Sequence, residues 1–162
     1  MPEPSTPADV VRAVAAGVNR LVSRNLTEQE KQAQLDHLAS LYAEQTDVRH
    51  PFAPLGDTPL HTRAELRRHF AEGPARVSGA DRFEPVGQVH ETADPEVVIY
   101  EFSYTGSANG RPFSIPCIFV VRVRDGLIVE SRDYSDHVGL ARAFGRLDNL
   151  ATALVGTPPP GP

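Results

Sequence analysis

Residues 120–136, VVRVRDGLIVESRDYSD, contain two runs of strand-forming residues joined by a tight turn. Asp125 and Gly126 supply the turn, because Asp-Gly pairs favour two-residue β-hairpin loops. The second run begins with apolar residues but ends in SRDYSD, residues 131–136, which is polar throughout. Either these polar residues only connect the strand to a helix predicted for residues 137–147, or one of them is held in a cavity for chemistry.

The residues before this hairpin continue the pattern of an antiparallel sheet. In EVVIYEFSY, residues 96–104, the even positions form an apolar face, and in RPFSIPCIFVVRV, residues 111–123, the odd positions do so. The turn ANG joins these two runs. Because Pro116 cannot donate a hydrogen bond to a strand ladder, we expect a bulge or bend there, which would help to curl the sheet.

Three amphipathic helices are predicted before this sheet. The first begins at Thr6 and Pro7, and TEQE, residues 27–30, has the form of a capping box that opens the second. A short strand around residues 46–52 follows, and the third helix begins at Thr62. The order predicts an α+β fold, in which a cone-shaped, curved antiparallel sheet packs against three N-terminal helices and encloses a pocket.

Length and composition narrow the class of protein. The 162 residues predict a single domain spanning 1–162, with a core at about 8–150 and flexible proline-rich tails at both ends. The net charge is −5 and the basic residues are scattered, so we expect no nucleic acid partner; no apolar run is long enough to cross a membrane. The chain start does not resemble a secretory signal and Cys117 is the only cysteine, so we expect a cytoplasmic protein.

Three stretches together resemble the SnoaL-like and ketosteroid isomerase-like proteins, which share the cone-shaped fold of nuclear transport factor two. They are LASLYAEQTDVRHPFAP at 38–54, HTRAELRRHF at 61–70 and the opening stretch at 120–136. The resemblance spans roughly residues 8–150. It implies the same fold, and it implies a function within a family that contains isomerases, polyketide cyclases, epoxide hydrolases, dehydratases and members without catalysis.

Steroid isomerase machinery is largely absent when the resemblance is carried over residue by residue. These enzymes place a carboxylate base just before a proline on the short strand, where this chain has His50. Their neutral acid falls within residues 117–119, which hold no carboxyl group, and their tyrosine falls near Val14. Polyketide cyclases of the family use an acid or base in the pocket, and nothing in the sequence excludes that chemistry.

Limonene epoxide hydrolase-like members offer a second comparison. They use an aspartate in a context similar to RDY, which matches Asp133. They add an arginine and a second aspartate on the strand that resembles YEFSY, where this chain has Phe102 and Tyr104. Half of that constellation is therefore missing, and epoxide hydrolysis would need a different acid.

Strand alternation selects Asp133 and His50 as candidate catalytic residues. Asp133 shares a face with Val129, and His50 shares a face with Val48. A carboxylate facing an apolar pocket should have its pKa raised above about 3.9, as a base near neutral pH requires, and histidine exchanges protons there with little adjustment. The alternative is structural: Asp133 could bond backbone N–H groups, Asp136 is expected to cap the last helix, and His50 could be a satisfied core residue.

Mostly aromatic side chains are expected to hold a substrate. The predicted substrate contacts are Tyr42, Phe52, Phe70, Tyr100, Phe102, Tyr104, Cys117 and Phe119. Cys117 lies in an apolar run and is expected to be a small core residue rather than a nucleophile. Arg67, Arg68 and His69 are expected on a solvated helix flank. The histidines lack metal-ligand spacing, so we predict no metal and no cofactor.

These observations favour a cofactor-independent SnoaL-like enzyme, an isomerase or cyclase, that acts on a small hydrophobic, carbonyl-containing or polycyclic ligand. One alternative is a non-catalytic binding module with the same pocket, and another is an epoxide hydrolase. A homodimer is also predicted, because Ile118 and Val120 would otherwise expose apolar groups on the outer face of the sheet.

Overall fold

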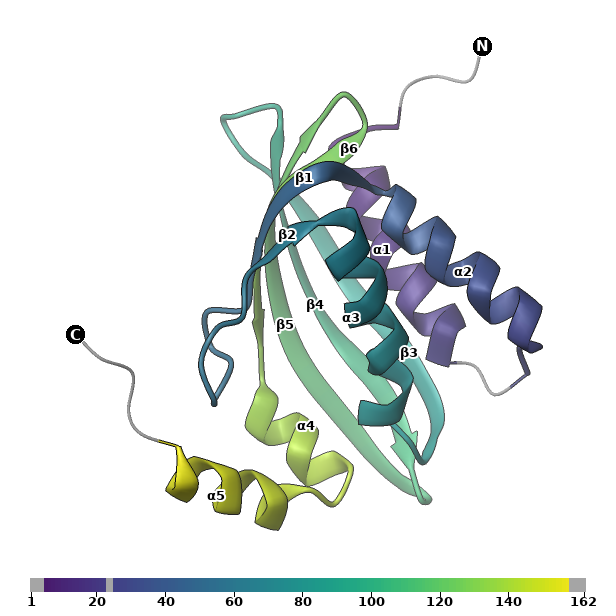
Figure 1. Ribbon diagram of the computed structural model, residues 1–162, viewed down its shortest axis with the longest axis vertical. Coiled ribbons are helices and arrows are strands. Elements are labelled where there is room, and N and C mark those ends of the chain that lie inside the picture. The colour runs from purple at the N-terminus through teal and green to yellow at the C-terminus, as the bar shows by residue number, and fades with distance from the viewer. Residues whose placement is uncertain (1–4, 23–24, 158–162) are drawn as a thin grey trace.

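The computed structural model describes residues 5–22 and 25–157, and most of the two predicted tails lies outside them. The described chain contains five helices and six strands, in the order α1-α2-β1-β2-α3-β3-β4-β5-β6-α4-α5 (Figure 1). The helices are α1 (Pro7–Val22), α2 (Glu28–Ser40), α3 (Arg63–Arg76), α4 (His137–Ala143) and α5 (Leu147–Gly156). The strands are β1 (Tyr42–Arg49), β2 (Leu60–Thr62), β3 (Ala80–Glu91), β4 (Val97–Ala108), β5 (Arg111–Arg124) and β6 (Leu127–Ser135).

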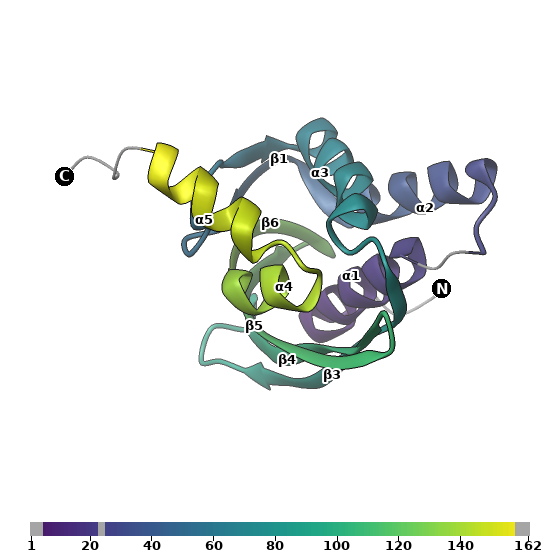
Figure 2. The ribbon, with the colours of Figure 1, turned by 90° about the horizontal axis from the view of Figure 1, so that it is seen from below.

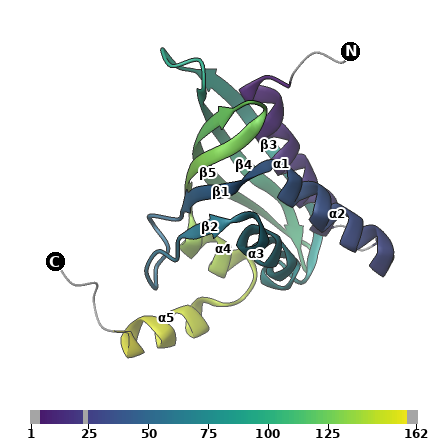
Figure 3. The same ribbon diagram turned by 45° about the horizontal axis from the view of Figure 1, so that its top comes forward.

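The strands form one strongly curved sheet in the order β2-β1-β6-β5-β4-β3. Strands β3 to β6 make an antiparallel meander, as predicted for the last three. The sheet is mixed rather than wholly antiparallel, because β1 runs parallel to β6. The sheet wraps around the three N-terminal helices (Figures 1 and 3), which confirms the predicted α+β cone.

The register between β1 and β6 positions the candidate site. Arg49 stands beside Arg132 in the parallel ladder, so the following residues, His50 and Asp133, emerge at the same end of both strands. A salt bridge holds this register: the Arg132 Nη2 atom lies 2.7 Å from Asp47 Oδ2, and Arg132 Nη1 donates to the Asp47 backbone carbonyl at 2.7 Å. The two candidate catalytic residues are therefore brought together by the sheet itself.

Two elements differ from the sequence prediction. Strand β3 is absent from the prediction because Pro85 and Gly87 interrupt its alternation, yet it pairs along its length with β4. A Cβ atom at Gly87 would lie 2.2 Å from the Glu101 carbonyl oxygen, so the close approach requires glycine. The single helix predicted at 137–147 is instead two helices, because Gly145 adopts a left-handed φ of 68° between them.

The bend predicted at Pro116 is also not found as a register shift. Pro116 stands opposite Ser103 in an unbroken β4–β5 ladder. The irregularity in β5 lies between Arg122 and Val123, where the pairing with β6 shifts. Pro116 directly precedes Cys117, the first residue of β5 that pairs with β6. The Pro116 carbonyl accepts a hydrogen bond from the Asp136 backbone N–H at 3.1 Å.

The helices begin where the sequence predicts and cover the concave face of the sheet. Thr27 with Glu30 and Thr62 with Glu65 form complete capping boxes at the starts of α2 and α3. Helix α1 packs across β3, β4 and β5, and α4 lies at one end of the sheet, near α3 (Figure 2). Within the described ranges, every helix is too short or too polar to cross a membrane.

Candidate active site

A cavity of about 820 Å³ lies between the concave face of the sheet and helices α1, α3 and α4. Most of its wall is apolar. The inner wall includes Val14, Val18, Leu66, Phe70, Ile115 and Phe119. Polar side chains reach it at a few places, and the groups able to exchange protons include Asp133, His50, His69 and His137. A ring-sized hydrophobic molecule would fit such a space, with polar contacts fixing its orientation.

Asp133 projects from β6 into this cavity. Only 13% of its side chain remains accessible, and burial raises its pKa to about 7, against the smaller opposing effects of the Ser131 hydroxyl and the Arg132 charge. The Ser131 hydroxyl donates a hydrogen bond to Asp133 Oδ1. Asp133 is thus a carboxyl group that exchanges its proton near neutral pH and faces an apolar space.

His50 lies beside Asp133 in the cavity wall. Its Nε2 atom lies 3.8 Å from Asp133 Oδ2, which is too long for a hydrogen bond. Burial lowers the pKa of His50, although the Asp57 carboxylate opposes this effect. The pKa of His50 falls below its ordinary value, whereas that of Asp133 rises to about 7. Near neutral pH, His50 is therefore uncharged while Asp133 loses its proton. The contact is therefore a polar pair with one titrating member and not a stable ion pair.

His69 also faces the cavity, and here the predicted solvated flank is wrong. The His69 ring centroid lies 5.0 Å from that of His50, and burial lowers the pKa of His69 to about 3, with a further contribution from His50. The helical spacing offered a signal, because His69 follows Leu66 by three residues and precedes Phe70, and both are buried.

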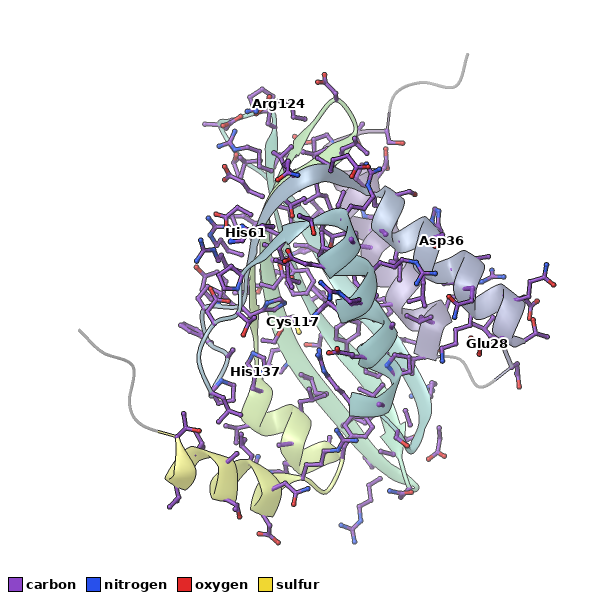
Figure 4. All side chains as sticks on the ribbon, viewed as in Figure 1. Glu28, Asp36, His61, Cys117, Arg124 and His137 are labelled. Atoms are coloured by element: carbon purple, nitrogen blue, oxygen red, sulfur yellow. The ribbon has the colours of Figure 1, made fainter. Side chains whose placement is uncertain are left out.

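His137 is a second polar residue that sequence reasoning missed. It is the first residue of α4, directly after the Asp136 cap, whose carboxylate accepts a hydrogen bond from the Gly139 backbone N–H at 2.8 Å, as predicted for this cap. Burial lowers the pKa of His137. Both His137 and Cys117 line the cavity, and Figure 4 shows His137 at the start of α4 and Cys117 beside α3 in this view.

Five of the predicted substrate contacts line the cavity. They are Tyr42, Phe70, Tyr104, Cys117 and Phe119. Burial raises the pKa of the Tyr42 and Tyr104 hydroxyls, and the nearby Asp133 charge raises both further, so the two phenols stay protonated beside the carboxyl group. Burial also raises the pKa of Cys117 to about 11, which keeps it a thiol and suits the predicted wall residue rather than a nucleophile.

The other three predicted contacts do not line the cavity. Phe52 is 67% exposed and packs edge-on against Tyr134 outside the cavity, because β1 ends at Arg49 and the strand alternation no longer applies. Tyr100 and Phe102 stack with ring centroids 4.2 Å apart in the buried core. They share the inner face of β4 with Tyr104, but they belong to the part of the core that contacts α1 rather than to the cavity wall.

Metal binding finds no support in this arrangement. Across residues 5–22 and 25–157, no group of three or more His, Cys, Asp or Glu side chains is placed so that it could hold a metal ion.

Residues 24–131 match the family model described as a SnoaL-like domain. Among curated proteins, the uncharacterised protein YesE of Bacillus subtilis is 30% identical over 108 residues, which are 65% of this chain and 72% of YesE. An uncharacterised PhzA/B-like protein of Pseudomonas aeruginosa is 33% identical over 109 residues, 65% of this chain and 75% of that protein.

Solved structures of similar shape support the same fold. A proposed isomerase from Bacillus subtilis matches with a TM-score of 0.67 and 24% identity, over 86% of this chain and 94% of that one. IdmH, a proposed polyketide cyclase from Streptomyces antibioticus, matches with a TM-score of 0.63 and 22% identity, over 87% and 99%. A protein with a ketosteroid isomerase-like fold from Catenulispora acidiphila matches with a TM-score of 0.61 and 19% identity, over 87% and 95%.

Proposed function

Because this chain belongs to the SnoaL-like domain family, we propose that it is a cofactor-independent enzyme that moves protons on a small hydrophobic substrate, in an isomerisation or a cyclisation. The observation that carries this proposal is Asp133. A carboxyl group with a pKa of about 7, held in an apolar cavity of about 820 Å³, has the protonation behaviour that a general base needs near neutral pH.

The roles of the neighbouring groups follow from their protonation. Ionised Asp133 would remove a proton from a carbon next to a carbonyl group. Neutral His50, 3.8 Å away, and the protonated Tyr42 hydroxyl could then donate hydrogen bonds to the oxygen on which negative charge develops. Protonated Asp133 would return the proton at another atom of the substrate, which completes an isomerisation. In a cyclisation, the enolate carbon would attack a second carbonyl group of the substrate, and Asp133 would give the proton to the alkoxide oxygen that this bond formation leaves.

The walls of the cavity support a hydrophobic, ring-sized substrate. Phe70, Tyr104, Phe119 and Ile115 present apolar surface on several sides, and excluding water from such a site strengthens the electrostatic effects on the reacting atoms. Similar structures carry the names of a proposed polyketide cyclase and a proposed isomerase. Those names describe the other proteins, and they favour a carbonyl-containing or polycyclic substrate here.

Deuterium exchange can test this proposal before the natural substrate is known. A panel of aromatic ketones and 1,3-diketones is incubated with the protein in heavy water, and NMR follows exchange of the acidic C–H proton. We expect the Asp133→Asn variant to exchange more slowly by about 10²-fold or more. Asp125→Asn is the matched control, because Asp125 lies in the β5–β6 turn with a left-handed φ of 53° that asparagine tolerates.

Two results would contradict the proposal. One is an exchange rate in Asp133→Asn equal to that of the wild type. The other is tight binding of ketones from the panel without any exchange above the buffer rate. The second result would support the alternative of a non-catalytic binding module.

A further inference from the structure

Three nitrogen-bearing side chains at the α3–α4 side of the cavity have no part in the proposed proton transfer. His69 and Arg76 come from α3, and His137 is the first residue of α4. All three line the cavity. They come from segments far apart in the sequence, so their convergence is a property of the fold and not of a local motif.

Arg76 adds a guanidinium group to the two imidazoles. It lines the same cavity as both histidines, and its positive charge contributes to lowering the pKa of each. Its ion pair is with Glu72, one turn earlier in α3, at 3.1 Å. The Glu72 side chain is 69% exposed, so this pair lies in a well-solvated position and is weak. Guanidinium N–H groups of Arg76 remain available to a second acceptor.

His137 carries an unsatisfied nitrogen. Its Nε2 atom is shielded from solvent and has no hydrogen-bond partner among residues 5–22 and 25–157. Buried polar atoms of side chains are nearly always paired, and one without a partner beside a cavity is a candidate for pairing with a bound molecule. This unpaired nitrogen belongs to a residue that lines the same cavity as His69 and Arg76.

The carboxylates around this part of the cavity are already engaged. Asp136 caps α4 through the Gly139 N–H. Glu65 caps α3 and accepts from the His61 and Thr62 backbone N–H groups at 2.6 and 3.0 Å. Glu72 pairs with Arg76, and Asp133 is the proposed base. Arg76 offers only N–H donors, and each neutral imidazole offers one N–H, so these three side chains can together donate to an acceptor that carries negative charge.

We infer that the substrate is a hydrophobic acid whose carboxylate binds between His69, Arg76 and His137, while its ring system lies against the apolar wall and Asp133. This inference deepens the proposed function, on which it rests in treating the bound molecule as a substrate. Arg76 supplies the fixed positive charge, and the two imidazoles supply N–H donors that gain positive character when an anion binds.

Isothermal titration calorimetry with 2-naphthoate and 2-naphthamide tests the inference directly. The two probes share their rings and differ in the charge of one substituent. We expect the wild-type protein to bind the carboxylate about 10-fold more tightly than the amide or better. Arg76→Gln and His137→Phe should each reduce this ratio several-fold. Arg82→Gln on β3 is the matched control, because Arg82 is exposed and does not line the cavity.

The outcomes separate this inference from the proposed function. Asp133→Asn should keep the preference for the carboxylate, although it loses proton exchange. If the wild type prefers the carboxylate probe but catalyses no proton exchange, the inferred carboxylate site is supported and the proposed enzymatic function is contradicted. Equal affinities for the two probes, no binding of the carboxylate, or an unchanged ratio in Arg76→Gln would overturn the inference. Because Arg76 lies at the surface end of α3, its variant keeps the test valid if His137→Phe fails to fold.

Discussion

Asp133 and Arg132 are neighbours in β6, and the pleat of the strand gives them opposite surroundings. Arg132 points outward and pairs with Asp47, which also accepts from Arg49 Nε at 2.6 Å. Asp133 points inward to the cavity. The outward residues of the polar strand end fix the strand beside β1, and its inward carboxyl group faces the cavity, where we propose that it acts as a base. The outward pairs also hold His50 in register with Asp133.

We predict that Asp133→Asn leaves the fold intact and that, as pH rises, the variant becomes increasingly more stable than the wild type. The folded-state pKa of about 7 lies above the ordinary aspartate value of 3.8, so the folded protein binds the proton more tightly than the unfolded chain. Stability is lost as pH rises from about 4 through about 7. Asparagine has no such titration, and its advantage over the wild type should grow by about 2–4 kcal/mol over that range.

Urea unfolding at pH 5 and pH 8 measures this difference in the free energy of unfolding. Asp125→Asn, in the exposed turn, should show the same pH dependence as the wild type. If the Asp133→Asn advantage is equal at both pH values, the carboxyl group does not have a raised pKa in the folded protein.

His50 gives a second prediction at this scale. If it assists Asp133, His50→Ala should lower turnover of an identified substrate by about 10²-fold with little change in melting temperature. His50→Gln keeps hydrogen bonding without proton exchange. Because burial lowers the pKa of His50 and raises that of Asp133 to about 7, the activity of the wild type should rise with pH through about 7, as Asp133 ionises.

The Gln variant distinguishes the two roles that His50 could have. Full loss of turnover in both variants assigns proton transfer to His50. Activity retained in His50→Gln alone assigns it a hydrogen-bonding role as a polar wall of the cavity. Full activity in His50→Ala would remove it from the site altogether.

At the scale of elements, local signals predicted the structure well where they were strong. The hairpin turns have Asn109 and Asp125 at left-handed φ values of 51° and 53°, each followed by glycine, and the capping residues are visible as short motifs. Strand β3 could not be predicted, because its pairing depends on a partner strand and on Gly87 lying against the β4 backbone. The parallel pairing of β1 with β6 is likewise a long-range feature that no local pattern encodes.

The candidate site likewise contains residues that the sequence could predict and residues that it could not. Asp133 and His50 could be predicted from alternation because they lie within or directly after strands. Phe52 was wrong because the strand ends three residues earlier, at Arg49. His137 offered no signal, since it stands at the start of a helix whose position against the sheet is decided only on folding.

Helix packing gives a prediction at the element scale. A Cβ atom at Gly17 of α1 would lie 2.5 Å from Leu38 Cδ2 and 3.0 Å from Gln34 Nε2 of α2. Leu38 is fully buried and has little room to move. Gly17→Ala should therefore destabilise the protein by about 1–3 kcal/mol, although alanine normally favours a helix.

Denaturant unfolding measures this change. Gly156→Ala, at the end of α5, is the control, because an added Cβ atom there meets nothing within 4 Å, and its effect should stay within about 0.5 kcal/mol. A stabilised Gly17→Ala variant would show that α1 and α2 are packed more loosely than these distances indicate.

For the molecule as a whole, the two faces of the sheet differ in what covers them. Helices cover the concave face (Figure 3), and the cavity lies between them and the sheet. The convex face has no helix over it among the described residues and carries apolar side chains, with Ile118 44% exposed and Val86 58% exposed. Val86 lies opposite Ser103, and Ile118 lies opposite Glu101, on neighbouring rows of β4. Packing of this face against a second copy around a two-fold axis would remove these apolar groups from water.

We therefore predict a homodimer that buries the convex face. Sedimentation velocity at micromolar concentration should give the mass of a dimer for the wild type, and Ile118→Glu should shift it to a monomer, because two buried carboxylates would face each other across the axis. Val155→Glu is the matched control: Val155 is 90% exposed on α5, away from the sheet, and its charge should leave the dimer intact. A wild-type monomer at these concentrations would contradict the homodimer. A dimer that survives Ile118→Glu but not Val155→Glu would show that the interface lies away from the sheet.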